Sequence, residues 1–209
     1  MSVDQAQAAT PADGACLVPL KCHPGTGNAA VRGVFANARV TPDGGIAFTY
    51  VLEADLSRLR IPPRGTGGCV DGLWQHTCLE AFAAVPGTAE YREFNFAPSG
   101  DWAVYAFCRY REGIAVTIAH GPQITVHVGD GRLELEAIVP REHVQDDVSA
   151  AGWRIALSAV IEDDAGVLGY WALEHPPGKP DFHHPDGFAL ALPPATSSAN
   201  IGAADGGQE

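Results

Sequence analysis

Hydrophobic and polar residues alternate with a period of two along most of this chain. The clearest example is Arg132–Val139, in which Leu133, Leu135 and Ala137 are separated by glutamates. A period of two places successive side chains on opposite faces of a β-strand, so the pattern is typical of strands that bury one face. The chain is therefore restricted to a fold built from half-buried strands.

Turn residues separate the alternating segments, among them Asp43-Gly44 and Gly129-Asp130-Gly131. Glycine (24) and proline (16) account for 40 of the 209 residues, which favours many short elements and disfavours a helical bundle. We expect one short helix, near residues 141–148. The predicted strands cover residues 31–40, 45–54, 73–85, 90–96, 102–110, 124–128, 132–139, 154–162, 167–174 and 188–192. Ten or eleven strands with tight turns predict an all-β fold, an antiparallel β-sandwich or barrel.

The two ends of the chain differ in composition from the middle. Residues 1–13 and 194–209 are small, polar and aperiodic, so we expect a disordered leader and a disordered tail around one domain at 14–193. The first thirty residues contain no apolar run of the kind found in signal peptides, and no stretch approaches the length of a membrane span. We therefore expect a soluble cytoplasmic protein.

The charge excludes two classes of partner. Thirteen basic and 25 acidic residues give a net charge of −12, which disfavours nonspecific binding to nucleic acid or to an anionic membrane. The five cysteines are odd in number and include no CxxC pair, so we expect neither a disulfide framework nor a cysteine-based zinc site. No strand–glycine–helix unit is present for a nucleotide.

Two strands carry polar residues that are unusual in a core. Taken as a strand, residues 73–85 place Trp74, His76 and Glu80 on one face. A buried carboxylate needs a partner, and Arg92, Arg109 or Arg111 is a candidate. The next strand places Tyr91, Glu93 and Asn95 on the face opposite Phe94 and Phe96. Aromatic planes beside carboxylate, amide and guanidinium groups are a common way to hold a sugar ring. The alternative is that these residues are structural.

The segment Glu174–Asp186 (EHPPGKPDFHHPD) is the densest in proline within the expected domain. Proline stiffens a loop and lowers the entropic cost of presenting side chains. The segment contributes His175, Lys179, Asp181, His183 and His184. The spacing of the histidines matches no known metal motif, so we expect a rigid loop with ligand contacts. A metal or haem site through the histidines is the alternative.

Signatures of hydrolases are missing, since the chain has neither GxSxG nor HExxH. Paired carboxylates such as Glu80 and Glu93 leave a carboxylate-based enzyme open as a further alternative. A protein-interaction domain without a ligand is the remaining one.

Three blocks in this order, LWQHTCLEAF, YREFNFAPSGDWAVYAFCRYREG and YWALEHPPGKPDFHHPDGFALAL, resemble bacterial DOMON-like proteins. That group is similar to family 9 carbohydrate-binding modules. The resemblance spans about residues 15–193 and implies a jelly-roll-like β-sandwich that binds sugar or haem without catalysis. Haem-binding members typically ligate iron with Met and His, whereas the only methionine here is Met1.

The sequence therefore predicts a non-catalytic β-sandwich module that binds a carbohydrate or a related small polar ligand, with no catalytic residue, no metal ligand and no required cofactor. Family 9 modules clamp a sugar between two tryptophans, and Trp74, Trp102, Trp153 and Trp171 are all available for such a pair. Trp102 is a candidate because it lies at a strand start beside a turn, a usual position for an accessible indole, and Trp171 is one because it lies at a strand end just before the proline-rich loop. The predicted ligand-binding residues are Trp74, His76, Glu80, Tyr91, Glu93, Asn95, Trp102, Arg109, Arg111, Trp171, His175, Lys179, Asp181, His183 and His184.

Overall fold

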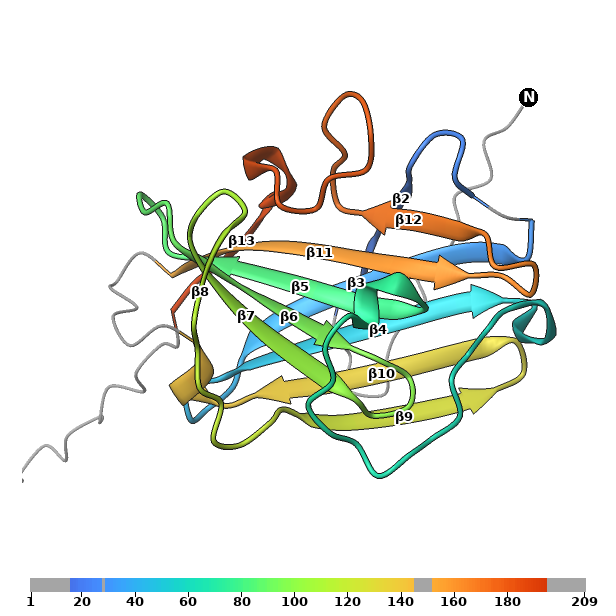
Figure 1. The fold of residues 1–209 in the computed structure, drawn as a ribbon, viewed down its shortest axis with the longest axis horizontal. Helices are drawn as coiled ribbons and strands as arrows, with labels where there is room; N and C mark the ends of the chain where they lie inside the picture. Colours follow the sequence, from blue (N-terminus) through green and yellow to red (C-terminus); the bar gives the residue numbers. More distant parts are fainter. Residues whose placement is uncertain (1–15, 28, 145–151, 195–209) are drawn as a thin grey trace, which may run out of the picture.

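Alternating segments of the chain pair into two antiparallel β-sheets that face each other. The computed structural model describes residues 16–27, 29–144 and 152–194. Figure 1 shows the two layers, and every pair of strands in them is antiparallel. The prediction of an all-β sandwich is confirmed.

The smaller sheet has five strands and the larger one has eight. In spatial order the smaller sheet consists of β1 (Val18–Pro19), β3 (Val31–Val40), β4 (Ile46–Ala54), β10 (Arg132–Val139) and β9 (Gln123–Gly129). The larger sheet consists of β2 (Lys21–Cys22), β12 (Leu168–Ala172), β11 (Trp153–Glu162), β5 (Cys78–Ala84), β6 (Tyr91–Phe96), β7 (Trp102–Arg109) and β8 (Glu112–Ile114), with β13 (Leu190–Leu192) paired to β11.

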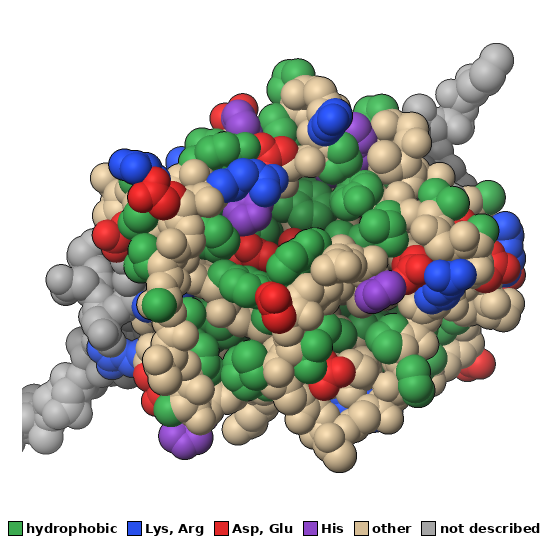
Figure 2. Space-filling view, in the orientation of Figure 1, with side chains coloured by type: hydrophobic (Ala, Val, Ile, Leu, Met, Phe, Trp, Pro, Cys, Tyr) green, Lys and Arg blue, Asp and Glu red, His purple; other side chains and the backbone are tan. Residues whose placement is uncertain are grey.

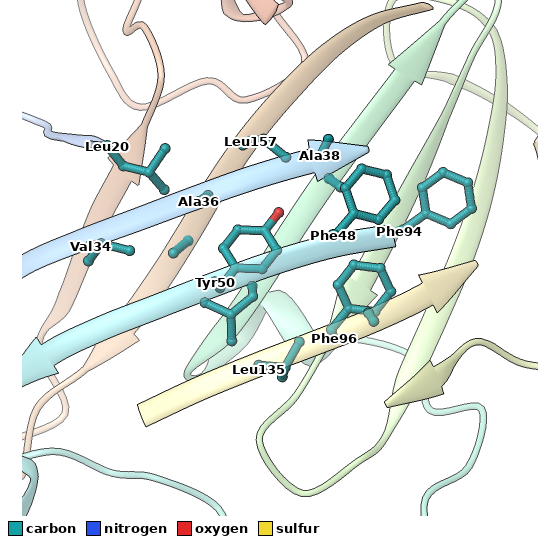
Figure 3. Close-up of a cluster of buried hydrophobic side chains, with 14 of the residues drawn as sticks. Leu20, Val34, Ala36, Ala38, Phe48, Tyr50, Phe94, Phe96, Leu135 and Leu157 are labelled. Carbon is teal, nitrogen blue, oxygen red and sulfur yellow. The ribbon is translucent and has the colours of Figure 1, made fainter. Parts of the chain in front are cut away.

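The core lies between the inner faces of the two sheets (Figure 3). Phe48 of β4 contacts Phe94 and Phe96 of β6, with ring centroids 6.0 and 5.9 Å apart. All three rings are fully buried. Truncation of such a ring to alanine costs about 3–5 kcal/mol, so this contact between the sheets is a main source of stability.

Helical structure among the described residues is limited to four 3-10 turns: η1 (Leu56–Arg58), η2 (Leu73–Gln75), η3 (Arg141–His143) and η4 (Pro185–Gly187). None of the described helices is long and apolar enough to cross a lipid bilayer. The helix predicted at 141–148 is a single 3-10 turn as far as His143, and residues 145–148 lie outside the described residues. The predicted leader at 1–13 and tail from residue 195 onward also lie outside them.

The strand predicted at 73–85 begins five residues later than predicted, at Cys78. Leu73–Gln75 is the 3-10 turn η2, and β5 begins at Cys78. Gly72 has a φ of 78°, a left-handed conformation that favours glycine, and it turns the chain immediately before η2. Trp74 and His76 therefore stand on a turn at the end of the larger sheet instead of within it.

The outer face of the larger sheet is not simply solvated. Glu80 on β5 lies between Ser158 on β11 and Asn95 on β6 in the strand register, and all three residues are buried. The segment at 173–189, which follows β12 and is orange to red in Figure 1, passes beside this face. The fold thus places buried polar groups under a proline-rich loop.

Candidate functional site

A hollow of about 360 Å³ opens on the outer face of the larger sheet. Figure 2 shows it with acidic side chains at its base between hydrophobic ones. Its volume lies within the range of small-molecule sites. The lining residues are Trp74, Glu80, Glu93, Tyr105, Phe107, Arg111, Val160, Tyr170, Pro180, Phe182 and His183.

Strand register explains why these side chains meet. Glu93 of β6 lies opposite Tyr105 of β7, and Tyr91 lies opposite Phe107. Because side chains alternate between faces, the core residues Phe94 and Phe96 force Glu93 and Asn95 onto the outer face. The two faces predicted for residues 91–96 are confirmed.

Two glutamates form the base of the hollow. Glu80 is 3% exposed and Glu93 is 5% exposed, and Asn95, which lies opposite Glu80 in the register, is fully buried. The Asn95 Nδ2 amide donates a hydrogen bond of 2.9 Å to Glu93 Oε1. Oε1 of Glu80 and Oδ1 of Asn95 are buried and have no hydrogen-bond partner among the described residues. The base therefore presents acceptors and needs donors.

The pKa values of both glutamates are raised. Burial, and then the neighbouring Glu93 carboxylate, raises the pKa of Glu80 well above its usual range. Burial raises the pKa of Glu93 to about 7, although the Asn95 hydrogen bond and the Arg111 charge act in the opposite direction. At neutral pH the two carboxyl groups thus hold at least part of one proton between them. Such a pair can donate or accept a proton near pH 7.

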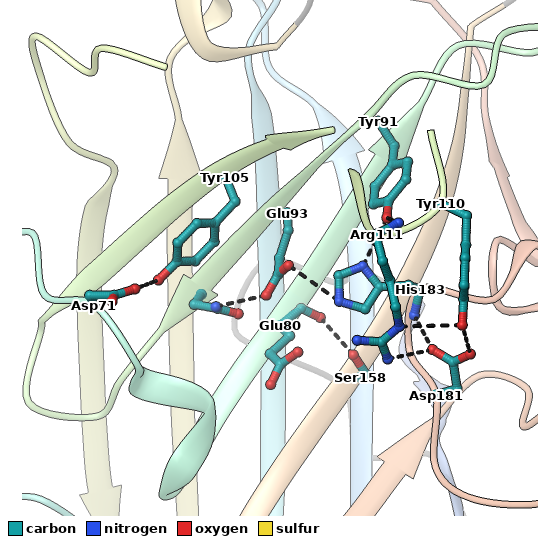
Figure 4. A network of polar contacts seen from close by, with 11 residues as sticks. Asp71, Glu80, Tyr91, Glu93, Tyr105, Tyr110, Arg111, Ser158, Asp181 and His183 are labelled. Atoms are coloured by element: carbon teal, nitrogen blue, oxygen red, sulfur yellow. Dashed lines mark hydrogen bonds and ion pairs between the residues drawn. The ribbon is translucent and has the colours of Figure 1, made fainter. Parts of the chain in front are cut away.

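Arg111 is fixed at the rim by the loop. Its Nη2 donates to Asp181 Oδ1 at 2.8 Å, and the Tyr110 hydroxyl donates to Asp181 Oδ2 at 2.7 Å (Figure 4). Although partial burial raises the pKa of Asp181, the hydrogen bonds from Tyr110 and Arg111 leave it below the ordinary value. Arg111 therefore forms its ion pair with Asp181, although its charge also lowers the pKa of Glu93.

His183 connects the loop to the base of the hollow. The Tyr91 hydroxyl lies 2.9 Å from His183 Nδ1 and accepts a hydrogen bond from the Arg111 backbone N–H. His183 Nε2 lies 3.7 Å from Glu93 Oε2. With the proton on Nε2, the imidazole accepts from Tyr91 and turns an N–H toward the carboxylate. Burial and the Arg111 charge lower the pKa of His183 to about 4, so the ring is neutral at pH 7.

Aromatic rings form the walls. Trp74 packs edge-on against Tyr105 at 5.7 Å, and Phe107 stacks on Tyr91 at 4.7 Å. The Tyr105 hydroxyl donates to Asp71 Oδ1 at 2.6 Å, and burial together with that carboxylate raises the pKa of Tyr105. On the opposite side Phe182 of the loop packs against Tyr170 of β12. Apolar walls over a polar base are the usual plan of a small-ligand site.

Of the fifteen predicted residues, Trp74, Glu80, Glu93, Arg111 and His183 line the hollow. Tyr91, Asn95 and Asp181 hydrogen-bond directly to one of those lining residues. The structure thus brings eight of the predicted residues together in one place.

The two tryptophans predicted from the strand ends lie elsewhere. Trp102 pairs with Phe96, so its side chain faces the core instead of forming an accessible indole. Trp171 pairs with the buried Ala159 and also packs against the core, where its indole N–H is buried without a hydrogen-bond partner. In both cases the strand register fixes the face, and position at a strand end does not.

The remaining predicted residues are outside the hollow. His76 contacts Glu162 at 2.7 Å in a second hollow of about 880 Å³ beside η2, and Arg109 pairs with Glu112 at the surface. His175 donates a hydrogen bond to the backbone carbonyl of Lys21. Lys179 and His184 line a separate surface depression, which Asp181 also lines. None of the three arginines predicted as partners pairs with Glu80 in the described part of the chain: Arg92 lies on the inner face, Arg109 pairs with Glu112 and Arg111 pairs with Asp181.

Six lining residues were not among those predicted from the sequence: Tyr105, Phe107, Val160, Tyr170, Pro180 and Phe182. A signal for two of them was present, because alternation along 102–110 sets Tyr105 and Phe107 opposite the apolar Val104 and Ala106. That pattern becomes informative only when β7 is known to pair with β6.

The loop histidines do not converge on one point. Within residues 16–27, 29–144 and 152–194, no group of three or more His, Cys, Asp and Glu side chains is arranged to hold a metal ion. His175, His183 and His184 each have different neighbours. A haem or metal site through these histidines stays a prediction that the arrangement does not favour.

No protein-family model and no curated protein matches the sequence. The fold is similar to a crystal structure, at 2.70 Å resolution, of a protein from Bacteroides uniformis ATCC 8492 that is described as a "putative carbohydrate-binding protein". The TM-score is 0.61 at 15% sequence identity, and the match covers 86% of this chain and 87% of that chain. At this identity the likeness establishes a shared fold.

Proposed function

We propose that the protein is a binding module for a carbohydrate or a related small polar ligand, and that the hollow over Glu80 and Glu93 is its site. One observation carries the proposal: buried hydrogen-bonding groups lie at the base of a pocket whose walls are aromatic rings. A sugar ring has hydroxyl groups at its edge and C–H bonds on its faces, so it matches both surfaces at once.

The structural neighbour from Bacteroides uniformis supports this proposal, because a chain of the same fold has been described as carbohydrate-binding. Membership of the DOMON-like group, with its relation to family 9 modules, is part of the proposal and rests on the three sequence blocks. Two of those blocks supply most of the hollow: β6 and β7 come from the second, and Tyr170, Phe182 and His183 come from the third.

Calorimetric titration with a panel of monosaccharides and disaccharides tests the function directly. We expect dissociation constants in the micromolar to millimolar range, as for a small open site. Trp74→Ala removes part of the wall at a side chain that is 41% exposed, so the variant is expected to fold and to bind at least about fivefold more weakly.

Ile114→Ala is the matched control, because Ile114 is an exposed hydrophobic residue of the same sheet that does not line the hollow. Its affinity for the sugar should equal that of the wild type. The proposal is wrong if no sugar binds at millimolar concentrations, or if Ile114→Ala weakens binding as much as Trp74→Ala.

A carboxylate-based enzyme is a second candidate, favoured by the placement of Glu80 and Glu93 in one hollow on the same sheet. Hydrolysis of glycosides uses one protonated carboxyl group and one carboxylate, and a pair that shares a proton near neutral pH can supply both. Turnover of aryl glycosides by the wild type and its absence in Glu93→Gln would support this candidate, and no turnover by either protein would dismiss it for those substrates.

A further inference from the structure

The base of the hollow has more acceptors than donors. Glu80 lines the hollow, is almost completely buried, and has Oε1 without a hydrogen-bond partner among the described residues. Oδ1 of the adjacent Asn95 is also buried without a hydrogen-bond partner among the described residues. A buried oxygen without a donor costs on the order of 1–3 kcal/mol. A ligand that presents N–H or O–H groups to these oxygens would recover that cost.

The charges around the hollow are also unbalanced. Six titratable side chains line the hollow or border the two glutamates: Tyr105 from β7, Tyr91 from β6, Tyr170 from β12, Arg111 from the β7–β8 turn, and Asp181 and His183 from the loop. Cys78 and Tyr50 also face Glu80, whose charge raises their pKa values. Arg111 is neutralised by Asp181, and His183 lies too low in pKa to carry a charge at pH 7. Among the described residues, Arg111 is the one Lys or Arg that lines the hollow, and its ion pair is with Asp181 instead of Glu80 or Glu93.

The walls favour a cation as well. Trp74, Tyr105, Phe107, Tyr170 and Phe182 surround the two carboxyl groups. The faces of aromatic rings attract ammonium groups, and the attraction is strongest where water is excluded. A neutral sugar would satisfy the unpartnered oxygens, but above pH 7, where the pair loses the proton it retains, it would leave the carboxylate charge in a desolvated site.

We propose that the ligand is an amino sugar, whose protonated amine binds between Glu80 and Glu93 while its ring packs on the aromatic wall. This inference rests on the proposed function, because it assigns the chemical class of the ligand that the same hollow takes. The amine donates to Glu80 Oε1 and supplies the positive charge that the base lacks.

The proposal fixes the sign of the pH dependence. An ammonium group binds the ionised carboxyl pair, so the pair must release the proton it retains near neutrality. Affinity for a ligand that stays protonated should therefore rise as the pH increases from 5.5 to 8. Affinity for a neutral sugar should change less over the same range, because a hydroxyl group gains a charge-assisted hydrogen bond and no ion pair.

The experiment is a calorimetric comparison of 6-amino-6-deoxyglucose, glucosamine, N-acetylglucosamine and glucose at pH 5.5, 7 and 8. A primary alkylamine has a pKa near that of lysine, about 10.4, so 6-amino-6-deoxyglucose stays protonated throughout. We expect at least one of the two amino sugars to bind about tenfold more tightly than glucose at pH 8. N-acetylglucosamine, in which the amine is neutral, should behave like glucose.

Glu80→Gln tests the assigned residue. Glutamine keeps the shape of the side chain and removes its charge, so the preference for an amine over glucose should fall by about fivefold or more. Glu136→Gln is the matched control, because Glu136 pairs with Arg39 on the other sheet. Circular dichroism and thermal unfolding confirm that both variants are folded.

The outcomes separate this inference from the proposed function. If glucose and N-acetylglucosamine bind at least as tightly as the amino sugars, carbohydrate binding stands and the assignment of an amino sugar is wrong. If no sugar of the panel binds, both fail. Retention of the full amine preference in Glu80→Gln would also overturn the inference.

Discussion

Glu80 of β5 and Asn95 of β6 lie directly opposite each other in the strand register, and each has one buried side-chain oxygen without a hydrogen-bond partner among the described residues. Such oxygens lower the stability of a folded protein. A chain selected only for stability would place apolar residues at these positions, as it does on the other face of the same strands. The pair is therefore the observation on which the proposed binding site depends.

Replacement of Glu93 by glutamine should stabilise the protein above neutral pH. The pKa of Glu93 is about 7 in the folded state and about 4.3 in an unfolded chain, so the wild type loses stability as the pH rises from about 4.3 through about 7. Glu93→Gln does not titrate, and its Oε1 can still accept from Asn95. We expect its free energy of unfolding to exceed that of the wild type by on the order of 1–3 kcal/mol at pH 8.

Urea denaturation at pH 5, 6, 7 and 8 measures this difference. The stabilisation should grow with pH and be smallest at pH 5, where the wild-type carboxyl group is protonated. Glu136→Gln, on the other sheet, should show no such trend. A difference between Glu93→Gln and the wild type that is constant from pH 5 to 8 would contradict a raised pKa at Glu93.

Much of the fold could be predicted from the sequence because alternation is a local property. The faces of β6 and β10 follow directly from it, since Phe94 and Leu135 each need a core. The 3-10 turn at Leu73–Gln75 could not be predicted, because the same alternation continues through it and only the left-handed Gly72 breaks the strand. The core-facing position of Trp102 also depends on its pairing with Phe96, which is a long-range property.

The candidate site was partly predictable for the same reason. Glu80, Glu93 and Asn95 stand out as polar residues inside strongly apolar strands. Tyr170 and Phe182 do not, because tyrosine and phenylalanine are ordinary in strands and loops, and only the three-dimensional packing of the loop on β12 brings them to the hollow. His183 and His184 are the same residue type and adjacent in sequence, and only their positions in the fold show that His183 lines the hollow and His184 does not.

His183 should remain neutral in mildly acidic solution. Its pKa is about 4, below the value of about 6.5 for an unperturbed imidazole, because burial and the Arg111 charge disfavour the imidazolium ion. Since the folded pKa is depressed, His183 lowers the stability as the pH falls from about 6.5 through about 4. Nitrogen chemical shifts of the imidazole, followed by NMR from pH 8 to 5, should stay at neutral values. A midpoint above pH 6 would refute the proposed environment of this ring.

Substitution of the two adjacent histidines should have very different effects. His183 packs against Phe82 at 5.2 Å and Phe107 at 5.1 Å and contacts the Tyr91 hydroxyl, so His183→Ala should cost about 2 kcal/mol of stability. His184 is more exposed and accepts one hydrogen bond from the Asp186 backbone at the start of η4, so His184→Ala should cost about 0.5–1 kcal/mol.

Thermal and urea unfolding of the two variants provide the comparison, and sugar titration of each adds a second readout. His183→Ala should also lower the affinity for the ligand, because the His183 ring lines the hollow. His184→Ala should bind the ligand with the affinity of the wild type. Equal losses of stability and affinity in the two variants would show that the loop as a whole, and not the His183 ring, supports the site.

Ligand-induced fluorescence changes should arise from Trp74. Among the four tryptophans it is the one that lines the hollow, whereas Trp102, Trp153 and Trp171 belong to the core or pack against it. A sugar that packs on the wall displaces water from the Trp74 indole and changes its emission. Trp74→Phe should therefore lose most of the change seen on titration with the bound sugar.

Trp171→Phe is the informative control for that experiment. It removes an indole whose N–H is buried without a hydrogen-bond partner, so the variant should be about as stable as the wild type, and the fluorescence response should persist. If instead the response disappears in Trp171→Phe and survives in Trp74→Phe, the ligand does not bind in the hollow over Glu80 and Glu93. The second hollow, beside His76 and Glu162, would not account for that result either, because Trp171 does not line it. Such an outcome would place the ligand near the edge of the larger sheet formed by β12 and β2, where Trp171 pairs with Cys22.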